Sequence, residues 1–207
     1  LAANVFVSKY ALQDPSGAYL ERNPDDMHKR MARELSRVES KYENPMSYEE
    51  IYDLFKDFKY VVPQGSPMSG IGNDHKVQSL SNCFVIESPW DSYGGILKSD
   101  QEMAQIAKRR GGVGFDISTI RPRGVITANA AKTTDGIEVF MQRFSNTCRE
   151  VAQGGRRGAL MLTISVHHPQ IRDFIKIKRD LTKVTGANIS VRVTDEFMNA
   201  VKNDQSV

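Results

Sequence analysis

From residue 83 onward, short apolar segments alternate with segments of helical periodicity, and this alternation constrains the fold more than any other feature of the sequence. The apolar segments predict strands over residues 83–86, 113–117, 159–166 and 188–193, of which the first is expected to be buried. The helical periodicity predicts helices from Ser99, with Glu102 completing a capping box, over about 135–151, after Pro169 and from Thr194. This order is typical of an α/β fold with a parallel sheet covered by helices.

The first part of the chain is predicted to be helical instead. Asn23 is suited to cap one helix, and Ser47 with Glu50 forms the capping box of a second helix. Residues 63–73 are rich in Gly, Ser and Pro and are predicted to form a loop. We therefore expect a helical N-terminal segment and an α/β region, with boundaries 1–62 and 63–207.

Charge and cysteine content narrow the class of protein. A net charge of +3 over 207 residues suits a protein that handles phosphates but does not require a nucleic-acid groove. Two cysteines are too few for a disulfide framework, which favours a reducing, cytoplasmic setting. The sequence has no apolar run long enough to cross a membrane and no signal-peptide pattern at its start. The last residues begin a helix and then stop, which predicts a truncated or naturally split protein.

The two cysteines occupy different sequence contexts. Cys83 stands where a polar Ser-Asn run enters the first predicted strand, so it is either a small buried apolar residue or an accessible redox thiol. Cys148 continues the apolar stripe of the predicted helix over about 135–151, which places it in the core.

Two segments combine glycine with paired arginines and could bind a phosphate group. Residues 109–115 read Arg-Arg-Gly-Gly-Val-Gly-Phe, and residues 153–158 read Gln-Gly-Gly-Arg-Arg-Gly. Glycine allows backbone N–H groups to approach a phosphate, and arginine adds a planar pair of donors. An ordinary tight turn explains each segment equally well, and neither has P-loop or dinucleotide-binding spacing.

Other polar residues follow the predicted strands, where ligands of open parallel sheets bind. The turn at residues 120–124 carries Arg121 and Arg123, and Asp91 with Ser92 could accept from a ribose hydroxyl or form a polar turn. The pair at residues 167–168 is assigned a structural role, because no other His or Cys has metal-site spacing and no metal site is predicted.

Together these motifs resemble the catalytic subunit of class I and class II ribonucleotide reductases. The resemblance rests on Ser-Asn-Cys-Phe-Val-Ile at 81–86, Arg-Gly-Gly-Val-Gly at 110–114, Ile-Arg-Pro-Arg-Gly at 120–124, Gln-Gly-Gly-Arg-Arg-Gly at 153–158 and Gly-Ala-Asn-Ile-Ser-Val at 186–191. It implies a helical entry segment followed by the first part of a ten-stranded α/β barrel.

The resemblance also implies residue roles. Cys83 matches a strand cysteine that reduces the substrate and becomes half of a disulfide. The positions that match substrate contacts are Ser66, Asn82, Gly112 and Arg157. The positions that match the site for an ATP or deoxynucleotide effector are Asp91, Ser92 and Arg121. The positions that match the loop linking effector to substrate are Gln153, Gly154, Gly155, Arg156 and Gly158.

Two departures from the family pattern concern these contacts. Asn82 stands where a serine is often found beside the cysteine, and Ala128 and Asn129 occupy the stretch that often holds a second phosphate-binding arginine.

The reaction that the resemblance implies is reduction of ribonucleotides to deoxyribonucleotides by cysteine-radical chemistry. Ribonucleoside diphosphates are the first expectation for the substrate, and triphosphates are the alternative. The radical is expected from a metal-containing small subunit in class I, the first expectation, or from adenosylcobalamin in class II. The radical cysteine and the second reducing cysteine are expected on sequence outside this chain, so the isolated chain is predicted to be inactive. Expected partners are the remaining catalytic subunit, a second copy bound through the effector site, the ribonucleotide, and a thioredoxin- or glutaredoxin-type reductant.

Two other readings compete with the reductase. A non-catalytic nucleotide-binding regulator would use the same loops without chemistry. An RNA-binding module would use the paired arginines, but such modules usually interleave exposed aromatic and basic residues, whereas the aromatic residues here follow helical core spacing.

Overall fold

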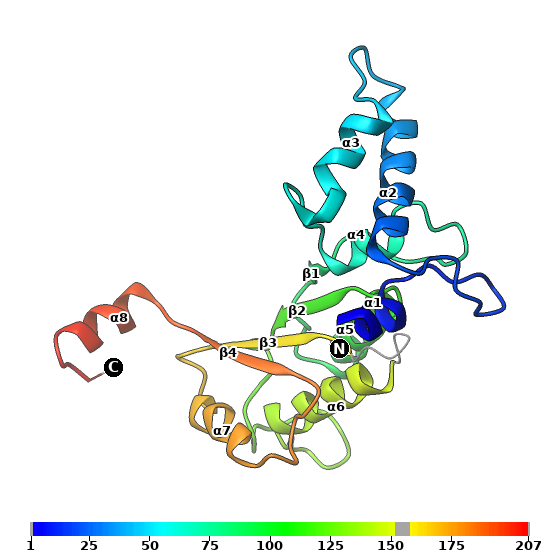
Figure 1. The fold of residues 1–207 in the computed structure, drawn as a ribbon. Helices are drawn as coiled ribbons and strands as arrows, with labels where there is room; N and C mark the ends of the chain where they lie inside the picture. The colour runs from blue at the N-terminus through cyan, green and yellow to red at the C-terminus, as the bar shows by residue number, and fades with distance from the viewer. Residues whose placement is uncertain (1, 152–157, 207) are drawn as a thin grey trace. The chain divides into compact units, whose positions relative to one another are not determined.

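The computed structural model describes residues 2–151 and 158–206, which form two compact units. The first unit extends to Asn82, and the second begins at Cys83 (Figure 1). The division between the two units therefore falls later in the chain than the domain boundary predicted after residue 62. That predicted boundary stays a prediction. No helix among the described residues is long and apolar enough to span a membrane.

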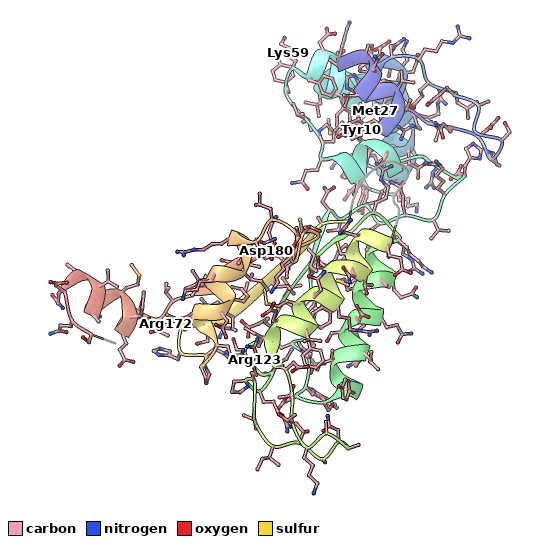
Figure 2. All side chains as sticks on the ribbon, turned by 90° about the horizontal axis from the view of Figure 1, so that it is seen from below. Tyr10, Met27, Lys59, Arg123, Arg172 and Asp180 are labelled. Atoms are coloured by element: carbon pink, nitrogen blue, oxygen red, sulfur yellow. The ribbon has the colours of Figure 1, made fainter. Side chains whose placement is uncertain are left out.

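The first unit is helical. Its elements are α1 (Ala2–Lys9), α2 (Pro24–Glu39), α3 (Tyr48–Phe55), the 3₁₀ turn η1 (Lys56–Phe58) and α4 (Gly65–Gly70). Met27 and Met31 of α2 are completely buried against Ile51 and Phe55 of α3. Tyr10 packs against the same small core, and both Met27 and Tyr10 can be located in Figure 2.

Local sequence signals set the starts of α2 and α3. The Asn23 side chain accepts from the Asp26 backbone N–H at 3.1 Å, and Ser47 and Glu50 form the expected capping box. Both cap predictions are confirmed. The prediction of loop over residues 63–73 was wrong in part, because α4 forms there under tertiary contacts that composition does not encode.

The second unit contains a four-stranded parallel sheet in the order β1-β2-β3-β4. Its strands are β1 (Cys83–Val85), β2 (Gly112–Asp116), β3 (Leu160–Ser165) and β4 (Asn188–Arg192). The helices between and after the strands are α5 (Tyr93–Ala107), α6 (Ile137–Glu150), α7 (Ile171–Lys176), the 3₁₀ turn η2 (Ile177–Arg179) and α8 (Asp195–Lys202). A helical segment followed by a helix-covered parallel sheet confirms the predicted fold class.

One face of the sheet holds the core. Val113 and Phe115 of β2 and Leu162 of β3 are buried with side chains from α5, α6 and α7. Helices α5 and α6 lie side by side over this face, as the green and yellow-green helices of Figure 2 show. The other face, which we call the open face, presents the alternate residues of each strand. The prediction that the first strand is buried was wrong, because β1 pairs only with β2 among the described strands and Val85 is 90% exposed.

Helix α5 begins earlier than predicted. Ser92, not Ser99, is its N-cap, with the Ser92 hydroxyl accepting from the Gly95 N–H at 3.1 Å. Ser99 is buried in the middle of the helix. A side chain at position 95 would place its Cβ 2.6 Å from the Trp90 carbonyl oxygen, so glycine permits this close helix start.

Candidate active site

Cys83 lies at the start of β1 on the open face of the sheet. Its side chain is exposed, and it pairs in register with Gly112 of β2. A hollow of about 340 Å³ surrounds this position, and its lining from the open face includes Gly112, Gly114, Met161 and Asn188. The two glycines leave room beside the sulfur that side chains would fill. The structure therefore favours the accessible reading of this cysteine over the buried one.

Cys148 has the opposite environment. It is 1% exposed within the core that α6 forms against the covered face of the sheet. Burial raises the pKa of its thiol, because the thiolate would lose its hydration there. Its predicted place in the core is confirmed, and this placement makes it a poor partner for a thiol on the open face.

The open face carries a polar cluster at the carboxyl ends of the strands. The Asp116 carboxylate accepts from the Thr163 hydroxyl at 2.8 Å and lies 3.4 Å from a guanidinium nitrogen of Arg192. Burial acts to raise the pKa of Asp116, but bonds from Ser118 and Thr163 and the charge of Arg192 outweigh burial and lower it. Partners on the neighbouring strands β3 and β4 thus favour the ionised form of this carboxylate on β2.

Two of the predicted substrate-contacting residues come together in the first unit. The Ser66 backbone N–H donates to the Asn82 side-chain oxygen at 3.0 Å, and the Asn82 amide donates to the side chain of Gln64. Ser66 is fully buried and Asn82 is half-buried. Asn82 immediately precedes Cys83 in the chain, so this hydrogen bond holds the last residue of the first unit against α4.

The three predicted effector residues converge on a pocket of about 230 Å³ after the ends of β1 and β2. Asp91 accepts from the Arg121 backbone N–H at 3.1 Å and from its Nε at 2.6 Å. Arg121 also donates to the carbonyl oxygens of Asp91 and Ile126, so it joins the two loops that form the pocket. The Ser92 hydroxyl lines the same pocket while capping α5.

Residues that the sequence did not single out also line this pocket. Tyr93 and Phe140 meet edge to face with ring centroids 6.0 Å apart. Because Tyr93 directly follows Ser92 in the sequence, its place in the pocket could have been predicted. Phe140 belongs to the apolar stripe of α6, which predicts only a place in the core. Thr127 and Asn129 line the pocket as well, where their side chains hydrogen-bond each other at 2.6 Å. The stretch without the expected second arginine is therefore part of the pocket wall.

Most of the predicted coupling loop lies outside the described residues. These positions are Gln153, Gly154, Gly155, Arg156 and Arg157. Gly158, which follows them, is described and packs so closely on α6 that an added Cβ would lie 2.7 Å from the sulfur of Cys148.

His168 fits its predicted structural role. It is buried, and its Nε2 lies 2.9 Å from the Ile120 carbonyl oxygen. This hydrogen bond supports the turn that carries Arg121. Among the described residues, no group of three or more His, Cys, Asp or Glu side chains is arranged to hold a metal ion.

Comparisons with known proteins match both parts of the chain to one family. Residues 81–207 match the family described as ribonucleotide reductase, barrel domain, and residues 1–73 match its all-alpha domain. A vitamin B12-dependent ribonucleoside-diphosphate reductase of Mycobacterium tuberculosis is 30% identical over 98% of this chain and 29% of its own length. A protein with the same description from Thermoplasma acidophilum is 37% identical over 70% of this chain and 19% of its own length.

A relative of a different description is similar over much of the chain. The ribonucleoside-diphosphate reductase large chain 2 of Saccharomyces cerevisiae is 32% identical over 74% of this chain and 18% of its own length. The chain thus spans less than a third of each of these relatives.

Proposed function

This chain belongs to the ribonucleotide reductase large-chain family, and we propose that it is the part of a catalytic subunit that carries one reducing thiol and the effector pocket. The substrate class would be ribonucleoside diphosphates, the class named for its relatives in bacteria, archaea and yeast. The first strands of the barrel and the loops that follow them would present these residues to the nucleotide.

The observation that carries this proposal is the exposure of Cys83 on the open face of the sheet. A reducing thiol must reach a sugar, and a strand holds a sulfur more rigidly than a loop does. The hollow beside Cys83, with glycine at positions 112 and 114, supplies space for a ribose next to that sulfur. Cys148 offers no such access, because it is buried in the core.

In the proposed reaction, Cys83 and a second thiol each give one electron and one proton to the ribose. The C2′–O bond breaks, the oxygen leaves as water, and a hydrogen takes its place on C2′. The two sulfurs join as a disulfide, which an external dithiol of the thioredoxin or glutaredoxin type reduces again. The second thiol and the radical cysteine would be supplied by the rest of the subunit, so the isolated chain would show no turnover.

The proposal places the radical source outside this chain. The family uses either a metal-containing small subunit or adenosylcobalamin, and the relatives described above include vitamin B12-dependent reductases. Adding each source separately to the complete subunit distinguishes them, because only the matching source should start turnover. The proposed setting is the reducing cytoplasm.

Effector control forms the second part of the proposal. The pocket around Asp91, Ser92 and Arg121 would bind ATP or a deoxynucleotide, in a subunit paired with a second copy, and bias residues 153–158 toward one substrate base. Arg157, which lies outside the described residues, would contact the substrate. Replacing Arg157 by Ala should remove the effector-dependent shift in substrate preference, and an unchanged shift would contradict this coupling.

The decisive experiment replaces Cys83 by Ser in the complete catalytic subunit supplied with its radical source and a dithiol. Turnover should fall by on the order of 10³-fold or more, because an essential reacting group is lost. Cys148→Ala serves as the matched control and should keep turnover. If Cys83→Ser keeps full turnover, Cys83 is not the reducing thiol and the proposal fails. If the wild-type assembly binds nucleotides without reducing them, the alternative of a non-catalytic nucleotide-binding regulator is favoured.

A further inference from the structure

A buried ion pair in the helical unit has no evident role in stability. Arg30 of α2 and Glu21 have side chains only 8% and 5% exposed, with Arg30 Nε 2.6 Å from Glu21 Oε1. Removing two charges from water costs several kcal/mol, and well-packed apolar residues are often as stabilising as such a pair. We therefore look for the role of this pair in the positions of the backbone groups to which Arg30 and Glu21 hydrogen-bond.

Arg30 holds the chain at and just beyond the carboxyl end of α4. Its Nη2 donates to the Met68 carbonyl oxygen at 2.7 Å, and its Nη1 donates to the Ile71 carbonyl oxygen. The last carbonyl groups of a helix have no partner within the helix, so the guanidinium replaces bonds that α4 cannot supply. A lysine ammonium could not reproduce this planar fork of donors.

The chain after α4 passes very close to α2. Gly72 has a φ of +70°, and a Cβ there would lie 3.0 Å from Cγ of Arg30. Glycine adopts this left-handed conformation without strain and leaves room for the Arg30 side chain. Glu21 also accepts from the Leu12 backbone N–H at 2.9 Å, so the ion pair connects the chain before α2 to the end of α4.

The other end of α4 carries the predicted substrate-contacting turn. The Ser66 backbone N–H donates to Asn82, and the Gln78 amide donates to the Ser66 carbonyl oxygen at 3.2 Å and to the Ser69 hydroxyl at 3.0 Å. Because α4 has only six residues, a shift at its clamped end would move Ser66 and Asn82 as well.

We infer that Arg30, held by Glu21, is a positioning residue that fixes α4 so that Ser66 and Asn82 are presented to the ribonucleotide. This inference rests on the proposed function, because it assumes that Ser66 and Asn82 contact substrate. Arg30 would act through its bonds to Glu21 and to the carbonyl groups of Met68 and Ile71, and not by contact with the substrate. Its charge is explained by the geometry it imposes on two backbone carbonyl groups.

The test uses the complete reductase with its radical source, and compares three variants. The double variant Glu21→Leu, Arg30→Met removes the clamp without leaving an unpaired buried carboxylate. Arg30→Lys keeps the charge but loses the fork. Ile51→Val weakens the same helical core while keeping Arg30, Glu21 and their hydrogen bonds, and serves as the control for lost stability.

We expect KM for the ribonucleoside diphosphate to rise by roughly tenfold in the double variant and in Arg30→Lys, with kcat changed less than about threefold. Ile51→Val should leave KM unchanged although it lowers stability, because it keeps the Arg30 fork in place. A wild-type KM in the double variant, or an equal rise in Ile51→Val, would overturn the inference.

Hydrogen exchange separates this inference from the proposed function. The backbone amides of residues 66–73 should exchange faster in the double variant than in wild type, while those in the middle of α2 should not. Unchanged exchange over residues 66–73 would refute the clamp whatever the enzyme does. Faster exchange over residues 66–73 in an assembly that binds ribonucleotides without reducing them would refute the reductase function but leave the clamp in place.

Discussion

The two faces of the sheet in the second unit differ in what their residues do. The covered face presents side chains such as Phe115 and Leu162 to a continuous apolar core, which also contains Cys148. The open face presents Cys83, the hollow beside it and the Asp116 cluster. Strand alternation places the Cys83 thiol on the open face, where it is available for chemistry. The apolar stripe of α6 places the Cys148 thiol in the core, where it contributes to packing.

Neighbouring residues of β3 give the largest expected contrast between the faces. Leu162 is completely buried, whereas Met161 on the open face is 38% exposed. Leu162→Ala should lower the free energy of unfolding by about 2–5 kcal/mol, because it leaves a cavity. Met161→Ala should change it by less than about 1 kcal/mol. Urea unfolding of both variants measures the difference, and equal losses would show that the open face contributes to the core as much as the covered face does.

The pocket proposed to bind an effector extends this comparison to the ends of the strands. Arg121→Gln should weaken binding of ATP or a deoxynucleoside triphosphate by about tenfold, because it removes a charge and the bonds that join the pocket loops. Arg123→Gln is the matched control, since Arg123 lies on the same turn but pairs with Glu138 outside this pocket. Titration calorimetry measures both affinities, and similar losses in the two variants would argue for general electrostatic attraction instead of a specific site.

The smallest expected effect concerns the ionised carboxylate of the open face. The pKa of Asp116 lies below its ordinary value of 3.8 in the folded chain. Its contribution to stability is therefore complete above the unfolded pKa and is lost as the pH falls through the folded pKa. Asp116→Asn should flatten the dependence of unfolding free energy on pH below about 4, by less than about 1 kcal/mol.

Asp53→Asn on the exposed surface of α3 is the control for the pH measurement, because it removes the same charge outside the sheet. An equal flattening of the pH dependence in both variants would mean that the Asp116 cluster contributes nothing specific.

Much of the fold was accessible from local sequence signals. The caps at Asn23, Ser47 and Thr194 are satisfied as their residue types require, and apolar runs fall on all four strands. The start of α5 was missed, because Gly94 and Gly95 resemble a loop until the close approach to Trp90 is known. Helix α4 was missed because the hydrogen-bond donor for its Met68 carbonyl group is Arg30, a buried arginine distant in sequence.

The site was predictable where motif residues are adjacent in sequence or strand order. Cys83 and Gly112 meet because neighbouring parallel strands place them in register, and Asp91 meets Arg121 because both follow strand ends. Phe140 could not be assigned to the pocket, since its helical spacing fits the core equally well. Arg30 carried no sequence signal, because its role depends on contacts with backbone atoms of α4.

The central claim is that Cys83 is the thiol that reduces the substrate. A single turnover of the complete reductase without external reductant, followed by alkylation of the remaining thiols and peptide mapping, tests it most directly. The account predicts that Cys83 is recovered in a disulfide with a cysteine from the rest of the subunit, while Cys148 is recovered as a thiol. Recovery of Cys83 as a free thiol in protein that has formed one equivalent of deoxyribonucleotide would contradict the account.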